Sequence, residues 1–131
     1  MIKGFIAGLI IANGFEWIAH KYVLHGTHRV GQPRFSPVPD SMKSHWEHHR
    51  EVRKTDFSDY GYVEGIRNWR TRNEIMSLAV TVGVFGPLFY PVSKGMSLAV
   101  FYSAANYYYV HRRAHLEPEW AKKTIPWHYD H

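Results

Sequence analysis

Cysteine is absent from the 131-residue chain. This absence excludes disulfide bonds, thiolate zinc sites and iron–sulfur clusters held by cysteine, and it leaves the redox compartment undetermined. The length fits one domain, so we expect residues 1–131 to form a single domain. The net charge of +5 is by itself compatible with nucleic acid, an anionic membrane surface or an acidic substrate as partner.

Charged residues are also nearly missing from three apolar stretches, at 4–19, 75–92 and 95–110. A helix of 16 residues extends about 24 Å, slightly less than the ~30 Å hydrocarbon core of a bilayer, so each stretch is a short candidate for a membrane span. Three buried helices of a soluble bundle are the alternative. A Pro-rich connector at 31–41 precedes a polar, aromatic and amphipathic segment at 51–74, which we expect at the membrane surface.

Lysine and arginine are distributed unevenly between the two sides that three crossings would create. Fourteen of the sixteen fall within residues 20–74 and 111–131, which leaves Lys3 and Lys94 for the opposite side. This bias is typical of a cytoplasmic side, and the same topology places all ten histidines there. We therefore expect an all-α, integral membrane bundle of about three spans with a cytoplasmic, histidine-rich cap.

Small residues give further expectations for the apolar stretches. The N-terminal stretch resembles a signal peptide, but without a clear cleavage site we expect a retained anchor. Gly4 and Gly8 match a small-xxx-small pattern for close helix contact. Pro87 and Pro91 should kink or end the second stretch, with a short turn at 93–95 leading into the third.

Nine of the ten histidines fall into four clusters. These are His20 with His25, His45 with His48 and His49, His111 with His115, and His128 with His131. Residues three or four apart share one face of a helix, whereas His20 and His25 reach one centre only if the helix ends or distorts between them. Neutral imidazole binds Fe, Zn, Cu and Ni, and nine ligands exceed the needs of one ion, so the pattern implies two ions. His28 is more typical of a surface or hydrogen-bonding residue.

Other interpretations of a histidine-rich face remain open at this point. It could be a pH-sensitive surface, a weak metal-buffering patch or a site for anionic lipid headgroups. None of these requires helical spacing that is repeated in four clusters.

Several polar residues beside the clusters could orient the imidazoles. Glu16 precedes His20 by four residues and can accept a hydrogen bond from its ring, and Asn13, Glu16 and His20 form a polar stripe that we expect to face the bundle interior. Tyr107 and Tyr108 lie four and three residues before His111 and could act similarly, or could belong to an interfacial aromatic belt.

The segments EWIAHKYVLH, SHWEHHR, YYYVHRRAH and PWHYDH occur in this order, with a hydrophobic hairpin between the second and the third. Together they resemble the fatty acid hydroxylase/sterol desaturase superfamily of integral-membrane enzymes, over essentially the whole chain. The resemblance implies a di-iron centre, whose positions zinc can occupy in isolated protein. The implied ligands are His20, His25, His45, His48, His49, His111, His115, His128 and His131. Because the family's last motif has one more histidine after the position of His131, we expect the natural chain to continue.

The same resemblance implies an oxidoreductase of lipid metabolism, a monooxygenase that uses O2 to hydroxylate a long-chain lipid such as a fatty acyl chain. A desaturase of the same chemistry and a non-catalytic membrane metal-binding or transport protein are the alternatives. The chain has no haem-attachment motif, flavin signature or cysteine cluster, so we expect a separate electron donor, such as a ferredoxin, cytochrome or reductase, at the basic face. A basic, soluble nucleic-acid-binding protein is a third alternative, which predicts extraction without detergent and salt-dependent binding. We expect no nucleic-acid partner.

Overall fold

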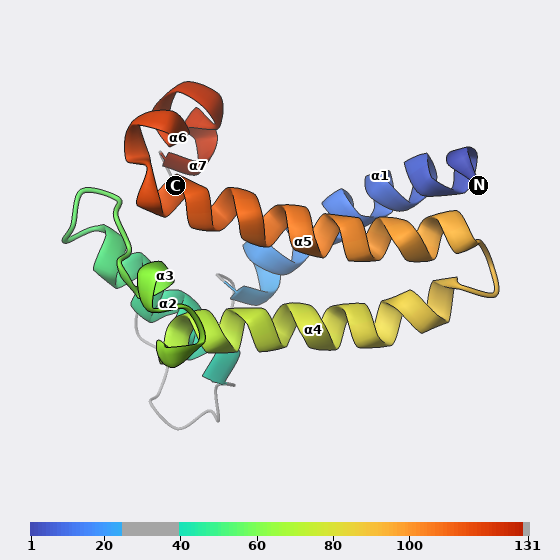
Figure 1. Ribbon diagram of the computed structural model, residues 1–131, viewed down its shortest axis with the longest axis horizontal. Coiled ribbons are helices and arrows are strands. Elements are labelled where there is room, and N and C mark those ends of the chain that lie inside the picture. Colours follow the sequence, from blue (N-terminus) through green and yellow to red (C-terminus); the bar gives the residue numbers. More distant parts are fainter. Residues whose placement is uncertain (25–39, 130–131) are drawn as a thin grey trace. The chain divides into compact units, whose positions relative to one another are not determined.

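The computed structural model describes residues 1–24 and 40–129 (Figure 1). All regular structure in these residues is helical, which confirms the all-α prediction. The predicted ligands His25 and His131 lie outside the described residues, as does most of the Pro-rich connector.

Seven α-helices form the described part of the chain. They are α1 (Ile2–Ile18), α2 (Asp40–Val52), α3 (Gly61–Glu64), α4 (Trp69–Phe89), α5 (Lys94–Leu116), α6 (Pro118–Thr124) and α7 (Pro126–Tyr129). A 3-10 helix, η2 (Gly65–Arg67), follows α3, and a π-helix, η1 (Ala19–Leu24), continues α1. In a π-helix the hydrogen bonds join residues five apart, so the α-helical geometry is interrupted from Ala19 to Leu24. A distortion of this kind is one of the two conditions under which His20 could share a centre with His25.

The chain divides into two compact units. Unit 1 comprises Met1–Pro39 and Leu78–Ala105, and unit 2 comprises Asp40–Ser77 and Asn106–His131. The helices α4 and α5 contribute residues to both units.

Small residues hold the helices of unit 1 together. The apolar parts of α4 and α5 run antiparallel, joined by a turn at residues 90–93 (Figure 1). The Ser97 hydroxyl donates a hydrogen bond of 2.8 Å to the Gly86 carbonyl, and the ring of Phe101 lies against Gly86. Because glycine has no side chain, this contact brings the two helix backbones close together.

The small-xxx-small pattern of α1 forms the close helix contact that the sequence predicted. A Cβ atom at Gly8 would lie 2.6 Å from the Ala99 Cβ atom and 3.0 Å from the Met96 Cα atom of α5. One turn earlier, Gly4 faces Ser93 at the turn that precedes α5. The ring of Phe15 packs edge-on against Phe85 of α4, with 5.2 Å between ring centroids.

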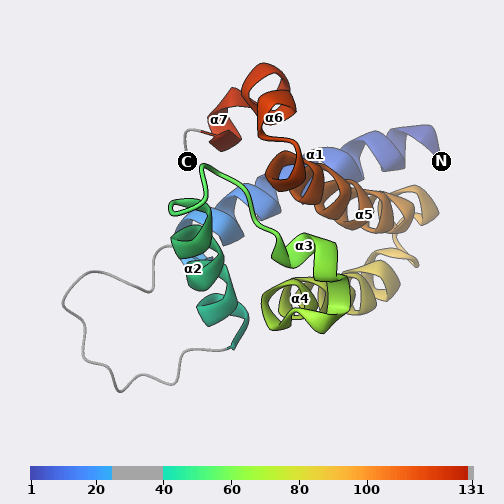
Figure 2. The same ribbon diagram turned by 60° about the vertical axis from the view of Figure 1, so that its left-hand side comes forward.

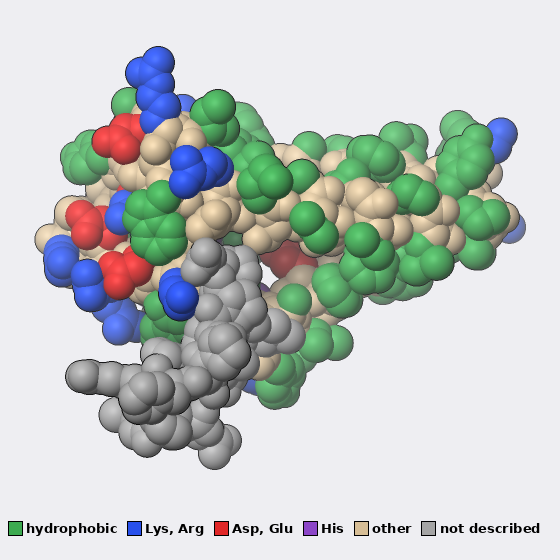
Figure 3. Space-filling view, turned by 90° about the horizontal axis from the view of Figure 1, so that it is seen from below, with side chains coloured by type: hydrophobic (Ala, Val, Ile, Leu, Met, Phe, Trp, Pro, Cys, Tyr) green, Lys and Arg blue, Asp and Glu red, His purple; other side chains and the backbone are tan. Residues whose placement is uncertain are grey.

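The face of unit 1 seen in Figure 3 carries many apolar side chains. Gly8 is the only buried residue of α1, while large side chains such as Ile6, Ile10, Val80 and Phe101 are exposed. A soluble bundle would show the opposite arrangement, with its large apolar side chains inside.

The prediction of three spanning helices is supported by length and composition for the first stretch alone. Within the described residues only Ile2–Tyr22 is long and apolar enough to cross a membrane, a property that a signal sequence shares. The second stretch is helical only as far as Phe89, where α4 ends shortly after Pro87. A longer helical segment would have to include the turn before Ile75, which contains the charged residues Arg72 and Glu74. The third stretch forms most of α5 but contains several serine and tyrosine residues and one asparagine.

Unit 2 has a core of a different kind, built from short helices and the ends of long ones (Figure 2). Its buried apolar residues are few: Val52, Tyr62, Ala114 and Ala121. Its buried polar and charged residues are more numerous: Ser44, His48, Asp59, Thr71, His111 and His115. Such a core is stable only when its polar groups satisfy one another.

The glycine contact in unit 1 predicts a difference between two alanine substitutions in α1. Gly8→Ala should lower the thermal stability of the protein in detergent relative to Gly14→Ala, because a Cβ atom at position 14 meets no atom within 4 Å. Both changes gain about 1 kcal/mol of helix propensity, and only the first overpacks a helix contact, at a cost of about 1–3 kcal/mol. Thermal unfolding followed by circular dichroism measures the difference. Equal stabilisation by the two changes would contradict the helix contact.

Candidate metal centre

Three histidines meet in the core of unit 2. His48 comes from α2, and His111 and His115 come from successive turns of α5; their exposed fractions are 6%, 6% and 2%. One ring nitrogen from each lies within 4.8 Å of the others. Histidine is rarely buried without a partner, and three in one place form a possible ligand set for a metal ion.

Each of the three rings has an oxygen acceptor at its Nδ1 atom. The acceptors are Asp59 Oδ2 for His48 at 2.7 Å, Glu74 Oε1 for His111 at 2.6 Å, and the Phe57 carbonyl oxygen for His115 at 2.8 Å. A carbonyl or an ionised carboxylate can only accept, so Nδ1 carries the proton in each ring. In the neutral imidazole this leaves a lone pair on every Nε2 atom.

The lone pairs of two rings face each other. His48 Nε2 and His115 Nε2 are 3.0 Å apart, a separation at which either a proton or a metal ion must lie between the two nitrogens. Burial, followed by the neighbouring charges of His111 and His48, lowers the pKa of His115 and disfavours a proton at this place. Two nitrogens that each lie about 2.0–2.1 Å from one metal ion are about 2.8–3.4 Å apart at right-angled to tetrahedral geometry. The residues therefore fit a metal ion.

His128 joins this group from α7. Its ring lies edge-on to His111 and to His115, with centroid separations of 5.0 and 5.3 Å. Four of the nine predicted ligands thus lie together, drawn from three separate sequence motifs.

His45 and His49 form a second pair on α2. Their Nε2 atoms are 3.1 Å apart, and the ring of His49 lies 5.7 Å from that of His48 between centroids. The i, i+4 spacing that predicted a shared face is confirmed.

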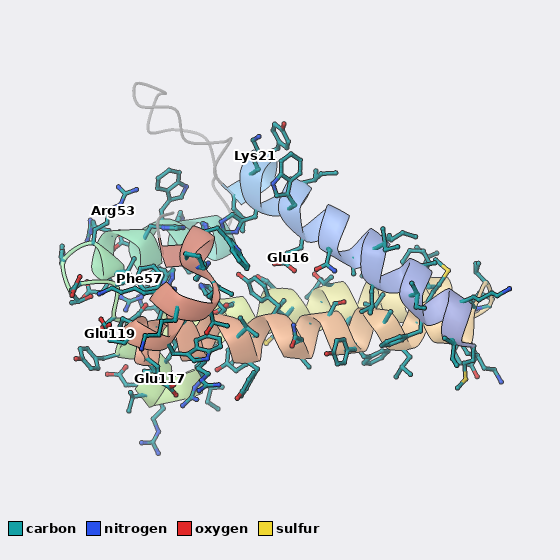
Figure 4. All side chains as sticks on the ribbon, turned by 90° about the horizontal axis from the view of Figure 1, so that it is seen from above. Glu16, Lys21, Arg53, Phe57, Glu117 and Glu119 are labelled. Carbon is teal, nitrogen blue, oxygen red and sulfur yellow. The ribbon has the colours of Figure 1, made fainter. Side chains whose placement is uncertain are left out.

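The remaining predicted residues have separate outcomes. His20 lies in η1 of unit 1, and its role as a ligand stays a prediction. Asn13 and Glu16 are solvent-exposed residues of α1. Glu16 points from α1 towards α4 and α5 (Figure 4), and the inward-facing stripe stays a prediction. Tyr107 lies beside His111 as expected, with 5.1 Å between ring centroids.

Comparisons with known protein families, with curated proteins and with solved structures find no match to this chain.

The sequence did not single out the two carboxylates of the site. Asp59 and Glu74 are among five acidic residues in segment 51–74, and no helical spacing links either to a histidine. Burial would raise the pKa of Asp59, but His48, the Gly61 amide and Arg70 outweigh it and lower the pKa to about 2. Asp59 Oδ1 accepts from Gly61 N and from an Arg70 Nη atom, each at 2.8 Å.

The Glu74 carboxylate accepts hydrogen bonds from Tyr62 and from His111. The Tyr62 hydroxyl donates to Glu74 Oε2 at 2.6 Å, while Glu74 Oε1 accepts from His111. Burial raises the pKa of Glu74 to about 6, against the hydrogen bond from Tyr62, so the carboxyl is ionised at neutral pH. Burial and then the charge of Glu74 raise the pKa of Tyr62, which keeps its proton as a donor.

The acceptor for His115 depends on an unusual backbone conformation. Asp56 and Phe57 have φ angles of 48° and 71°, in the left-handed region that non-glycine residues rarely adopt. Each such residue costs about 1–3 kcal/mol and persists only where its surroundings fix it. Here the Phe57 carbonyl accepts a hydrogen bond from His115, and the Phe57 ring lies 4.5 Å from the same imidazole between centroids. The strained turn therefore holds both a carbonyl and a ring on one candidate ligand.

The convergence of the three imidazoles predicts metal binding that depends on His48. His48→Gln keeps the approximate size of the side chain but removes the imidazole, so the purified full chain should bind about one metal equivalent fewer. Elemental analysis after loading with Zn²⁺ or Fe²⁺ measures this. His28→Ala, at the one histidine outside the predicted ligand set, is the control. Unchanged metal content in His48→Gln, with unchanged circular dichroism, would refute the assignment.

The Asp59 acceptor predicts a smaller effect. Asp59→Asn keeps the shape of the side chain but weakens the acceptor for His48, so metal affinity should fall about 10–100-fold. Glu64→Gln is the matched control, because Glu64 is exposed and accepts from Asn68. Competition with a chromophoric chelator measures both affinities. Equal affinities in the two variants would show that Asp59 does not support the site.

Proposed function

We propose that this chain is a membrane-bound, O2-dependent lipid hydroxylase with a histidine-ligated di-iron centre. The observation that carries the proposal is the group of three buried imidazoles whose Nδ1 atoms all have oxygen acceptors. Metal-binding histidines in proteins generally have such acceptors, which fix the tautomer and the orientation of the ring. The motif resemblance supplies the class of reaction.

His48, His111 and His115 would hold one ion, with His128 beside them. His45 and His49 would contribute to a second, with His20, His25 and His131 as the further ligands that the resemblance implies. Bound iron would supply the redox chemistry of O2 activation, which zinc lacks. The protein's part is to fix the ring orientations through Asp59, Glu74 and the Phe57 carbonyl.

The residues around the imidazoles favour chemistry that must exclude water. The rings of Phe57 and Tyr62 both pack against His115, with centroid separations of 4.5 and 5.9 Å. A dry site strengthens the hydrogen bonds to the carboxylates and limits side reactions of an activated oxidant. A solvated metal-buffering patch would need no such burial.

The apolar surface of unit 1 supports a membrane location. With α1 as a span and the apolar parts of α4 and α5 beside it, the exposed isoleucine, valine and phenylalanine side chains would face lipid acyl chains. The metal centre would then lie on the cytoplasmic side, next to a bilayer that supplies a long-chain substrate.

The overall reaction requires a source of electrons besides O2 and the lipid. One oxygen atom of O2 enters a substrate C–H bond to give an alcohol, and the other leaves as water, which consumes two electrons and two protons. The chain contains no cysteine for a cluster, and its sequence shows no haem-attachment or flavin motif. A separate ferredoxin, cytochrome or reductase would supply the electrons.

The proposal predicts a product that depends on the cluster. A host that expresses the protein with iron should accumulate lipids carrying one added oxygen atom. His111→Gln should abolish these lipids, whereas His28→Ala should not. Lipid mass spectrometry with ¹⁸O2 identifies the source of the oxygen.

Other outcomes would replace the proposal with one of its alternatives. Lipids that lose two hydrogens without gaining oxygen would assign a desaturase. Tight metal binding without any change in host lipids and without O2 consumption would assign a non-catalytic metal-binding protein.

A further inference from the structure

A short segment of unit 2 exposes four large side chains. Between residues 60 and 69, Tyr60, Val63, Ile66 and Trp69 have exposed fractions of 70%, 67%, 67% and 40%. Single exposed apolar residues are common, but four within ten residues, each three residues after the last, are typical of a contact surface. We call residues 60–69 the interfacial turn.

The interfacial turn is held in place from its inner side. Tyr62 is buried and hydrogen-bonded to Glu74, and the Thr71 hydroxyl donates to the Gly61 carbonyl at 3.1 Å. Gly65, at the tip, has a φ angle of +60°, and a Cβ atom there would meet nothing within 4 Å. The exposed side chains therefore project from a fixed turn whose tip is open.

The charges around the patch favour an anionic partner. Residues 60–72 contain one acidic side chain, Glu64, and three arginines. Arg70 is paired with Asp59, whereas Arg67 and Arg72 are exposed and form no ion pair within the described parts of the chain. Aromatic and aliphatic side chains beside unpaired arginines are typical of the headgroup layer of a membrane.

The interfacial turn leads into α4, so its distance from the apolar part of α4 indicates its depth in the membrane. Residues 75–93 contain no charged side chain, and Trp69 precedes Ile75 by six residues. At 1.5 Å per residue this separates them by about 9 Å along the helix. The headgroup layer on each side of the hydrocarbon core is about 5–8 Å thick. If the hydrocarbon core begins near Ile75, Trp69 lies at the outer edge of the headgroup layer.

We propose that the interfacial turn inserts Tyr60, Val63, Ile66 and Trp69 into the headgroup layer of the bilayer, where Arg67 and Arg72 bind anionic lipid headgroups. This inference rests on the membrane placement in the proposed function. It adds a second membrane contact, in the unit that holds the metal centre. Because Tyr62 lies on the inner side of the same turn, this contact places the lipid surface next to the Tyr62–Glu74–His111 chain of hydrogen bonds.

The absence of cysteine makes a direct test possible. Single variants Ile66→Cys, Val80→Cys and Glu119→Cys of the full chain are labelled with a nitroxide and placed in nanodiscs of phosphatidylcholine with phosphatidylglycerol. All three positions are exposed, so the labels should not disturb the fold. Power-saturation EPR then compares collisions with O2, which enters the bilayer, and with a water-soluble nickel chelate.

The expected result is that the labels at positions 66 and 80 collide mainly with O2, while the label at 119 collides mainly with the nickel chelate. Equal nickel accessibility at 66 and 119, with 80 protected, would overturn the interfacial contact and leave the proposed function intact. Nickel accessibility at 80 would instead remove the membrane placement, and the inference with it.

A second arm tests the two arginines. Omitting phosphatidylglycerol should increase nickel accessibility at position 66, because the anionic headgroups no longer hold the turn. Arg67→Gln combined with Arg72→Gln should abolish this dependence on lipid charge, whereas Lys123→Gln, on α6, should not. A label at 66 that responds to phosphatidylglycerol equally in all variants would overturn the role of the arginines.

Discussion

Three imidazoles lie together in the core of unit 2, and the Nδ1–H group of each donates a hydrogen bond to an oxygen acceptor. Asp59, Glu74 and the Phe57 carbonyl are those acceptors, and they fix the orientations of the His48, His111 and His115 rings. The Nε2 atoms of His48 and His115 are 3.0 Å apart and repel one another unless a proton or a metal ion lies between them.

The surrounding structure compensates the cost of burying so many polar groups. The Asp59 carboxylate is balanced by Arg70 and the Gly61 amide, and Glu74 by the Tyr62 hydroxyl. The backbone at Asp56 and Phe57 adopts a left-handed conformation that only a closely packed turn can maintain. A core of this kind gives up part of the hydrophobic stabilisation that an apolar core would provide, which is common where a site is preorganised for a ligand.

The two units differ in which side chains they bury and which they expose. Unit 1 places large apolar side chains on its outside and joins its helices through glycine, alanine and serine, an arrangement suited to a lipid environment. Unit 2 holds most of the described charged groups and imidazoles. The proposed hydroxylase would use both units, because its substrate would be dissolved in the bilayer while its protons and electrons would come from the aqueous side.

Local spacing in the sequence determined the helices, the shared faces of His45 with His49 and of His111 with His115, and the glycine contact of α1. These follow from helical periodicity, which depends only on neighbours along the chain. Only the tertiary structure decided which carboxylates serve the site. Asp59 and Glu74 lie 11 and 37 residues from the histidines they bond, and the third acceptor is a backbone carbonyl whose side chain carries no signal. No periodic pattern connects such positions, because loop conformation and helix packing bring them together.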